Sequence, residues 1–175
     1  MWKHFKLQRM DEFRIRCEFG DMTQAYKDGI EFIVDYDDFV NHVMGYNFAM
    51  DTKGYVVYTS RKDGLNNKLL HRVIMGEPDG MFIDHIDHNP HNNCRSNLRI
   101  ATPQQNSMNR GKHKRNKSGI IGVSWDKKNE KWLATIALNN KNIHLGRFDD
   151  FEEACQARKD AEIKYFGEFR NKDNE

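Results

Sequence analysis

The middle of the chain places apolar runs, turn formers and a strong helix start in an order that few folds accommodate. The apolar run 81–83 leads into Asp84 and His85, and a stretch rich in Asn, His and Pro follows at 88–93. Residues of these types favour turns. A second apolar run, 98–101, predicts a strand that returns beside the first. This order predicts a strand, a wide loop and a second strand.

The helix start that follows carries three agreeing signals. Thr102 can cap the first turn, Pro103 occupies the first helical position, and Gln105 completes a capping box. Asn106 comes next, so its amide lies near the start of this helix. Because neighbouring strand residues point to opposite faces, the acid and the imidazole of the first strand can share a site only if the strand ends there. The loop that follows them predicts such an end.

These side-chain types suit the hydrolysis of a phosphodiester bond. The reaction needs a base for the attacking water, and positive charge near the phosphate and the departing oxygen. Imidazole is the base whose ordinary pKa suits the first task near neutral pH. The oxygen donors of Asp84 and Asn106 suit a hard cation such as Mg2+. An Asp-His dipeptide alone is a weak signal, so the wider sequence decides.

Residues 70–110, LHRVIMGEPDGMFIDHIDHNPHNNCRSNLRIATPQQNSMNR, resemble the HNH homing endonucleases of bacteriophage group I introns and their free-standing relatives. The shared pattern is Asp-His, then 13 residues from that Asp to the Asn of Asn-Leu-Arg, and 9 more to a helical Asn. The resemblance implies a ββα-metal finger in which His85 is the general base and Asn97 pins the loop that orients it. It also implies that Asp84 and Asn106 hold one divalent ion, Mg2+ or alternatively Mn2+.

The loop departs from the family pattern without removing a proposed ligand or base. His88, Asn92 and Cys94 stand where glycine, aspartate and a basic or polar residue are common. His88 and His91 therefore become additional imidazoles near the site. We expect no ligand role for the remaining histidines in this half of the chain and the linker, with His71 packed or hydrogen-bonded against the finger and His4, His42 and His113 at the surface.

The region before the finger predicts an α+β scaffold. Its expected elements are a strand within 13–19, a strand at 30–34, a short helix from Asp35 or Asp37 to Gly45, a hairpin formed by 46–50 and 55–60, and a helix at 69–75. We expect Phe39, Val40 and Val43 on one face of the first helix. The stretch that contains this helix and the hairpin also resembles the region that precedes the finger in many HNH proteins.

The last third of the chain carries a second resemblance. Its Gly-Val, Lys-Trp and Leu-Gly-x-Phe landmarks fall within 119–168, which resembles the Apetala-two DNA-binding domain of plant ethylene-response factors, a domain also fused to phage HNH nucleases. Strands are expected at 120–125, 132–138 and 142–145, with a helix from Asp149 or Asp150 to Gly167 as their lid.

In that family the sheet enters the major groove of DNA. The resemblance implies these outward residues: Ser124, Asp126, Lys131, Thr135, Asn142, His144 and Arg147. Asp126 would repel phosphate, so we expect affinity and specificity to differ from the plant domains. At least one of Trp125 and Trp132 is expected in the core, as is usual for Trp on a small sheet.

Charge is distributed unevenly, although the formal net charge is only +2. Residues 88–125 hold seven Lys and Arg and no carboxylate, which predicts a polyanionic partner. A solvated loop is the alternative. The polar stretch 111–118 is typical of a linker. We expect five cations in and beside it to follow the DNA backbone: Arg110, Lys112, Lys114, Arg115 and Lys117.

The sequence as a whole predicts an α+β protein, with a ββα-metal finger nuclease followed by a small three-stranded antiparallel sheet packed on one helix. The expected segments are an N-terminal α+β region at 1–69, the finger at 70–110, the basic linker at 111–118 and the DNA-binding domain at 119–170. The predicted function is metal-dependent cleavage of double-stranded DNA at a preferred site, of the homing type. We expect no membrane span, no obligate protein partner and a cytoplasmic location.

Three cysteines, Cys17, Cys94 and Cys155, are too widely spaced for a disulfide framework or a zinc site, so we expect small buried thiols. Two alternatives to the homing-type nuclease stay open. One is a non-catalytic, sequence-specific DNA-binding regulator, and the other is a nuclease of low specificity. One finger presents one active site, so a monomer would most simply nick one strand.

Overall fold

The structure is a computed structural model that describes residues 14–17, 22–27, 30–59, 64–113 and 116–171. It divides into two compact units, Met1–Ala101 and Thr102–Glu175, which are described separately. The boundary falls after Ala101, inside the expected finger. His4, Lys114 and Arg115, and the side chain of Cys17, lie outside the described part.

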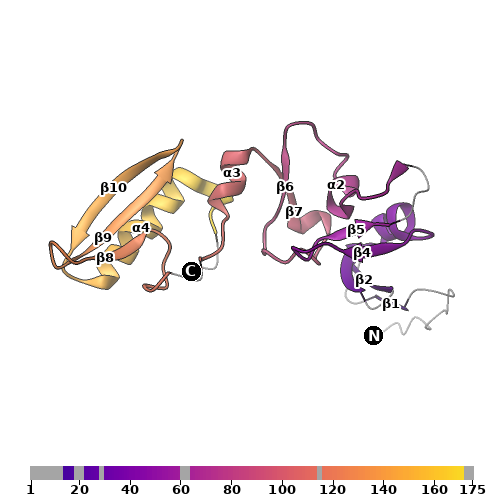
Figure 1. The fold of residues 1–175 in the computed structure, drawn as a ribbon, viewed down its shortest axis with the longest axis horizontal. Coiled ribbons are helices and arrows are strands. Elements are labelled where there is room, and N and C mark those ends of the chain that lie inside the picture. The colour runs from indigo at the N-terminus through magenta and orange to yellow at the C-terminus, as the bar shows by residue number, and fades with distance from the viewer. Residues whose placement is uncertain (1–13, 18–21, 28–29, 60–63, 114–115, 172–175) are drawn as a thin grey trace, which may run out of the picture. The chain divides into compact units, whose positions relative to one another are not determined.

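The first unit consists of small antiparallel sheets and short helices (Figure 1). Its elements are β1 (Arg14–Cys17), β2 (Met22–Lys27), β3 (Ile30–Asp35), α1 (Tyr36–Asp38), the π-helical turn η1 (Phe39–Val43), β4 (Phe48–Met50), β5 (Val56–Tyr58), α2 (Leu70–Ile74), β6 (Phe82–His85), the 3-10 turn η3 (Arg95–Asn97) and β7 (Leu98–Ala101). The strands pair in the order β1-β2-β3, with β4-β5 and β6-β7 as separate hairpins.

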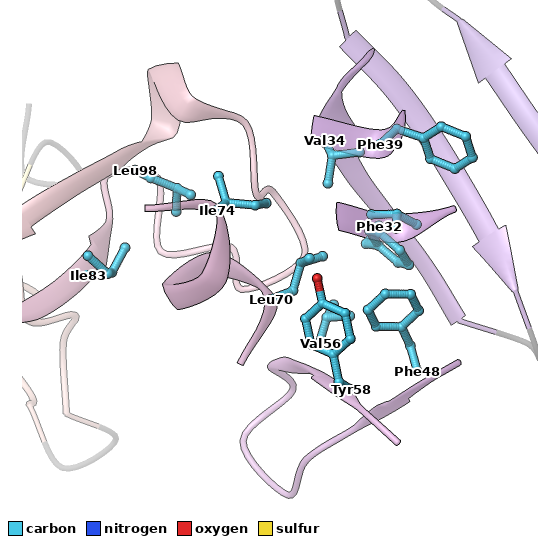
Figure 2. Packing of buried hydrophobic residues seen from close by; sticks show 11 residues of the cluster. Phe32, Val34, Phe39, Phe48, Val56, Tyr58, Leu70, Ile74, Ile83 and Leu98 are labelled. Carbon is cyan, nitrogen blue, oxygen red and sulfur yellow. The ribbon is translucent and has the colours of Figure 1, made fainter. Parts of the chain in front are cut away.

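One hydrophobic core joins the expected finger to the region that precedes it. Leu70 and Ile74 of α2 lie between Ile83 and Leu98 of the β6-β7 hairpin and the aromatic side chains around Phe32 of β3 (Figure 2). All five side chains are buried. The N-terminal region therefore shares a core with the hairpin that carries Asp84 and His85, and it helps to hold that hairpin in place.

The N-terminal region differs from expectation in three details. Strand β2 was not predicted. Asp35 precedes α1 but makes no side-chain cap there, and its carboxylate accepts the backbone N–H of Arg95 at 2.8 Å instead. Phe39 and Val43 are buried as expected, whereas Val40 is 38% exposed. Phe39 and Val43 share a face because they lie nearly one turn of the π-helix apart, whereas Val40 directly follows Phe39 and points to another side.

The second unit has one three-stranded antiparallel sheet with a long helix packed against it (Figure 1). Its elements are α3 (Pro103–Met108), β8 (Val123–Asp126), β9 (Lys131–Leu138), β10 (Lys141–Phe148), α4 (Phe151–Phe166) and the 3-10 turn η4 (Gly167–Phe169). The sheet order is β10-β9-β8. Ala134 and Ile136 of β9 point toward Ala154 and Ala161 of α4, and all four side chains are buried.

The expected elements of this unit are present, with shifted ends. Strand β8 begins later than predicted, and β10 runs three residues further because a bulge between His144 and Gly146 lets it continue. Asp150 caps α4, its side chain accepting the backbone N–H of Glu153 at 3.0 Å. The prediction of a mixed α+β protein with small antiparallel sheets is confirmed. Among the described residues, no helix has the length and apolar content needed to cross a bilayer.

Candidate functional site

The β6-β7 hairpin sets the positions of Asp84 and His85. Asp84 lies opposite Arg99, and His85 lies opposite Leu98. Strand β6 ends at His85, as the sharing of one site requires. Both residues are buried, with exposures of 6% for Asp84 and 5% for His85. Buried polar groups must be paired to be stable, so the partners of these two side chains define the site.

Asp84 forms a buried ion pair with Arg99 of the neighbouring strand. The Arg99 Nη2 lies 2.6 Å from Asp84 Oδ2, and the Arg99 Nε donates a hydrogen bond of 2.8 Å to the same oxygen. The two side chains are only 13% and 8% exposed. The guanidinium therefore holds the carboxylate in one orientation.

The ring of His85 is enclosed by polar and aromatic groups. Its Nε2 lies 3.5 Å from the Oδ1 of Asn93. The rings of His71 and Tyr55 pack against it, with centroids 4.9 Å and 5.7 Å away. Burial lowers the pKa of His85, while Asn93 and two nearby carboxylates act in the opposite direction. A neutral imidazole with a lone pair is the form that can accept a proton.

His71 is a second buried imidazole, carried by α2. Burial and the adjacent His85 lower the pKa of His71 to about 3. The ring lies edge-on to His85, with 77° between the planes. Tyr55 contacts both imidazoles, and burial, together with Asp51 and Asp84, raises the pKa of its hydroxyl. His71 thus packs against the hairpin, as expected, and contacts the proposed base directly.

Asn97 cross-links the two ends of the loop between β6 and β7. Its Nδ2 donates to Asp87 Oδ1 and to the backbone oxygen of Asn92, both at 2.8 Å. Its Oδ1 accepts the backbone N–H of Asp87 at 3.1 Å. Although burial opposes it, hydrogen bonds from Asn92, Asn89 and Asn97 hold the pKa of Asp87 below its ordinary value. These contacts are the ones that a loop-pinning role requires, and the catalytic role itself remains a proposal.

The two additional imidazoles of the loop have different settings. His88 has a left-handed backbone, with φ of 59°, at the place where glycine is common in the family. His91 lies against β3, with its Nδ1 3.0 Å from the backbone oxygen of Glu31. The backbone of β3 also pairs with the loop, because Ile33 exchanges hydrogen bonds with His91 and Asn93. The N-terminal region thus supports the loop directly.

Asn106 lies on α3 in the second unit and is half-buried. Its helix starts as predicted: Thr102 Oγ1 accepts the backbone N–H of Gln105 at 3.2 Å, and the side chain of Gln105 accepts the backbone N–H of Thr102 at 2.9 Å. Since Asp84 belongs to the first unit, their sharing of one ion stays a prediction. Within the part of the chain that the structure describes, no cluster of three or more His, Cys, Asp or Glu residues could hold a metal. The predicted donor pair, one carboxylate and one amide, is not of that kind.

The predicted DNA-binding residues of the second unit differ in their surroundings. Ser124, Asn142 and His144 are exposed on the strands. The two cations among these predicted residues are paired with acids. Arg147 Nε lies 3.0 Å from Asp126 Oδ2, and Lys131 Nζ lies 3.0 Å from Asp149 Oδ2.

The other predicted DNA-binding residues that the structure describes are Asp126 and Thr135 of the sheet and three cations in and beside the linker. Hydrogen bonds from Asn129 and Arg147 lower the pKa of Asp126 to about 2. Thr135 is half-buried, and the linker residues Arg110, Lys112 and Lys117 are exposed.

Two aromatic side chains of the sheet have separate environments. Trp132 packs against Phe151 of α4, with ring centroids 4.6 Å apart, so it belongs to the core. Trp125 is 46% exposed and lies edge-on to Trp132. The expectation that at least one Trp is in the core agrees with this arrangement.

Two cations of the carboxylate-free segment 88–125 pair with acids of the first unit. Arg95 forms a two-nitrogen ion pair with Asp38, at 2.7 and 2.9 Å, and Arg99 is paired with Asp84. Both carboxylates come from outside the segment. Two of its seven cations therefore stabilise the first unit, which corrects the expectation that the whole segment faces a polyanion.

Three partners of the site were not found from sequence. Asn93, Arg99 as the partner of Asp84, and Tyr55 beside His85 depend on contacts across the fold. The signal for Arg99 lies in the strand register, because pairing 82 with 101 places 84 opposite 99. Asn93 and Tyr55 carry no local signal, since their side chains reach His85 through the path of the loop and the packing of the β4-β5 connection.

Comparison with known proteins supports a specific family for this site. Residues 68–108 match the family model described as HNH endonuclease. The "Uncharacterized HNH endonuclease L560" of Acanthamoeba polyphaga mimivirus is 34% identical over 129 residues, which are 73% of this chain and 66% of that protein. "Protein 3.8" of Escherichia phage T7 is 47% identical over 75 residues, which are 43% of this chain and 62% of the phage protein.

A shorter match covers an SPbeta prophage protein of Bacillus subtilis (strain 168) whose name places it among HNH homing endonucleases. It is 45% identical over 56 residues, 29% of this chain and 32% of that protein. The chain spans just under two thirds of the length of the viral and phage relatives. No solved structure matches it significantly. Residues 68–108 are thus an HNH endonuclease domain, a nuclease domain that this chain has in common with viral and prophage relatives.

Proposed function

We propose that the protein is a metal-dependent endonuclease that hydrolyses phosphodiester bonds in double-stranded DNA at a preferred site. The observation that carries the proposal is the buried Asp84-His85 pair at the end of β6, inside the HNH segment. The prophage relative is named as a homing endonuclease, which supports the same type of activity here. We place this activity in the cytoplasm of an infected bacterial cell.

His85 acts as the general base. Its neutral imidazole takes a proton from a water molecule, whose oxygen attacks the phosphorus while the bond from phosphorus to the 3' oxygen breaks. The departing 3' oxygen takes up a proton from a water molecule, so the products are a 5' phosphate and a 3' hydroxyl. Asn97 holds the loop that carries the site closed at both ends, which keeps His85 in reach of that water. Positioning of this kind supplies a large part of the rate enhancement in phosphodiester hydrolysis.

Asp84 and Asn106 would hold the divalent ion. The setting of Asp84 fits this role, because Arg99 holds its buried carboxylate in one orientation, with an oxygen donor at the end of the strand. A carboxylate and an amide oxygen suit Mg2+, and Mn2+ accepts the same donors. When bound, the ion would offset the charge that develops on the phosphate and the departing oxygen.

The second unit would select the target. Its exposed Ser124, Asn142 and His144 offer hydrogen bonds to base edges, while the cations Lys131 and Arg147 are already paired with acids. This composition favours base recognition over simple attraction to phosphate. Arg110, Lys112 and Lys117 are exposed and would contact the DNA backbone. With one His85 per chain, a monomer would nick one strand.

The test is cleavage of duplex DNA by His85→Ala in Mg2+, together with DNA binding in EDTA. We expect cleavage to be lost and binding to be kept. His88→Asn is the matched control, because it replaces an imidazole of the same loop with a residue that tolerates the left-handed backbone there. Full cleavage by His85→Ala would refute the proposed base.

The wild-type protein separates the alternatives in the same assay. Tight binding at one site without metal-dependent nicking would indicate a regulator. Digestion of any plasmid without a preferred site would indicate a nuclease of low specificity. Sequencing of the cut ends from a phage or bacterial genome would identify the target and show whether one strand or both are cut.

A further inference from the structure

Asn93 is a fully buried carboxamide that points at the ring of His85. It is 0% exposed, and no charge neighbours it among its described hydrogen-bond partners. Its Nδ2 lies 3.2 Å from the backbone oxygen of His91 and 3.4 Å from that of Pro90. Because carbonyl oxygens only accept hydrogen bonds, the NH2 end of the carboxamide must face them. The oxygen end therefore faces His85.

The position of Asn93 is fixed by the backbone as well. Its N–H donates a 2.8 Å hydrogen bond to the backbone oxygen of Ile33 on β3. The backbone N–H of Ile33 donates in turn to the oxygen of His91. The loop is thus fastened to β3 on both sides of residue 92. A carboxamide held in this way cannot turn its NH2 toward His85 without losing hydrogen bonds in a buried place, which is costly.

The oxygen of Asn93 lies beside one specific ring nitrogen of His85. The Oδ1 to Nε2 distance is 3.5 Å. In a neutral imidazole one nitrogen carries the proton and the other carries the lone pair. An amide oxygen is an acceptor, so it stabilises the form in which Nε2 carries the proton. The lone pair is then on Nδ1.

Two neighbouring rings oppose rotation of His85 away from this arrangement. His71 meets the His85 ring edge-on at 4.9 Å between centroids, and Tyr55 meets it at 5.7 Å with 40° between the planes. His71 is itself buried on α2, with 4% exposure. Close packing of this kind holds side chains in single rotamers.

We propose that Asn93 is a positioning residue that selects the tautomer of His85, with the proton on Nε2 and the lone pair on Nδ1. Under the proposed function, on which this inference rests, Nδ1 is the atom that accepts the proton of the attacking water. Asn93 itself contacts neither DNA nor ion in this assignment. It acts only through His85, in the way that the second partner of a catalytic histidine fixes its working nitrogen.

The test begins with the wild-type full chain, labelled with 15N-histidine and free of metal, at pH 8. Ring nitrogen shifts in a long-range 1H–15N spectrum distinguish the two neutral tautomers. The signals of His85 are those that disappear in His85→Gln. We expect Nε2 to carry the proton. A predominance of the form protonated at Nδ1 would overturn the proposal, and this reading needs neither activity nor an Asn93 variant that folds.

The second arm compares Asn93→Leu with Asn92→Leu. Both remove a loop carboxamide, but the described hydrogen bonds of the Asn92 side chain go to Asp87 and to the backbone N–H of Cys94, and none goes to His85. We expect Asn93→Leu to give mixed tautomers and to slow DNA cleavage about 10- to 100-fold, with unchanged DNA affinity in EDTA. Asn92→Leu should keep the wild-type tautomer. Unchanged tautomer and cleavage rate in Asn93→Leu would contradict the proposal.

Failure of this inference and failure of the proposed function give different results. If the tautomer is as expected but wild-type protein does not cut DNA, the function fails and the role of Asn93 toward His85 stands. If His85→Ala abolishes cleavage while wild-type His85 is protonated on Nδ1, the function stands and the role of Asn93 fails.

Discussion

At the scale of residues, the Asp84-Arg99 pair is the buried contact on which we expect both stability and the proposed chemistry to depend. Removing one partner of a buried ion pair leaves the other charge unpaired in a poorly solvated place. We expect Arg99→Leu to lower the free energy of unfolding by about 3 kcal/mol, measured by urea denaturation without metal. The low exposure of both side chains, 13% and 8%, is the reason for so large an effect.

The control for this prediction is an exposed pair of the same unit. Lys68 and Glu77 form an ion pair of 2.8 Å in which the side chains are 42% and 40% exposed. Lys68→Leu should change the free energy of unfolding by less than about 1 kcal/mol. If the two variants lost the same stability, the buried pair would have no special role.

His71 predicts how stability changes with pH. Burial lowers its pKa from an ordinary 6.5 to about 3. Between these values the unfolded chain binds a proton at this residue and the folded protein does not. The contribution of His71 to the free energy of unfolding is therefore complete above pH 6.5. It is lost as the pH falls toward 3, by up to about 1.4 kcal/mol per pH unit.

The variant that tests this is His71→Phe, which keeps an aromatic ring and removes the titration. Urea denaturation between pH 7 and pH 5 should show a smaller loss of stability on acidification than in the wild-type protein. If the wild-type protein and His71→Phe lost the same stability between pH 7 and pH 5, His71 would take up a proton in the folded protein as readily as in the unfolded chain.

The residues of the site were predictable to different degrees. Asp84, His85 and Asn106 stand out because their spacing in the sequence is local and specific. The partners Asn93 and Arg99 do not, because a hydrogen bond across a loop or between strands depends on register and packing that sequence spacing does not encode. The roles of all these residues remain predictions that the variants above address.

At the scale of elements, the start of α3 makes a prediction of its own. The helix has six residues, so its capping box is a large share of its stability. Thr102→Ala should cost about 1 kcal/mol locally. The backbone N–H of Asn106 donates a hydrogen bond to the backbone oxygen of Thr102. We expect the hydrogen of this N–H to exchange with solvent about five times faster in Thr102→Ala than in the wild-type protein.

Asp150→Ala is the matched control, since Asp150 caps the sixteen-residue helix α4. It should leave exchange at Asn106 unchanged relative to other amides of the second unit. Equal exchange at Asn106 in wild-type protein and Thr102→Ala would show that packing, and not the cap, holds α3.

Elements with strong local chemistry were predicted well. The turn formers at 51–54 give the β4-β5 hairpin, and the capping residues Thr102 and Asp150 start α3 and α4. Strand β2 was missed because 22–27 mixes polar and apolar residues without a clear period, and its strand state depends on pairing with β1 and β3. Long-range pairing of this kind overrides local propensity.

At the scale of the whole molecule, the linker cations predict the salt dependence of DNA binding. Each phosphate neutralised by a cation contributes about 0.9 to the slope of log affinity against log salt. Replacing Arg110, Lys112 and Lys117 together with Ser should lower that slope by about 2.7. Filter binding or fluorescence anisotropy in EDTA, over a range of salt concentrations, measures it.

Lys164→Ser provides the comparison for the linker variants. Lys164 is an exposed cation on α4, which packs on the sheet. Its removal should leave the slope unchanged. If the salt slope stayed the same in the linker variant but fell in Lys164→Ser, the DNA would bind at helix α4 and not at the linker.

The central claim for the whole molecule is that Asp84 in the first unit and Asn106 in the second bind the same ion. Titration of Mn2+ by electron paramagnetic resonance, on wild-type protein, Asp84→Ala, Asn106→Ala and the double variant, tests it most directly. If one ion uses both donors, each single variant should lose most of the affinity of that site, and the double variant should lose little more. Wild-type Mn2+ affinity in Asn106→Ala, or losses that simply add, would contradict a shared ion.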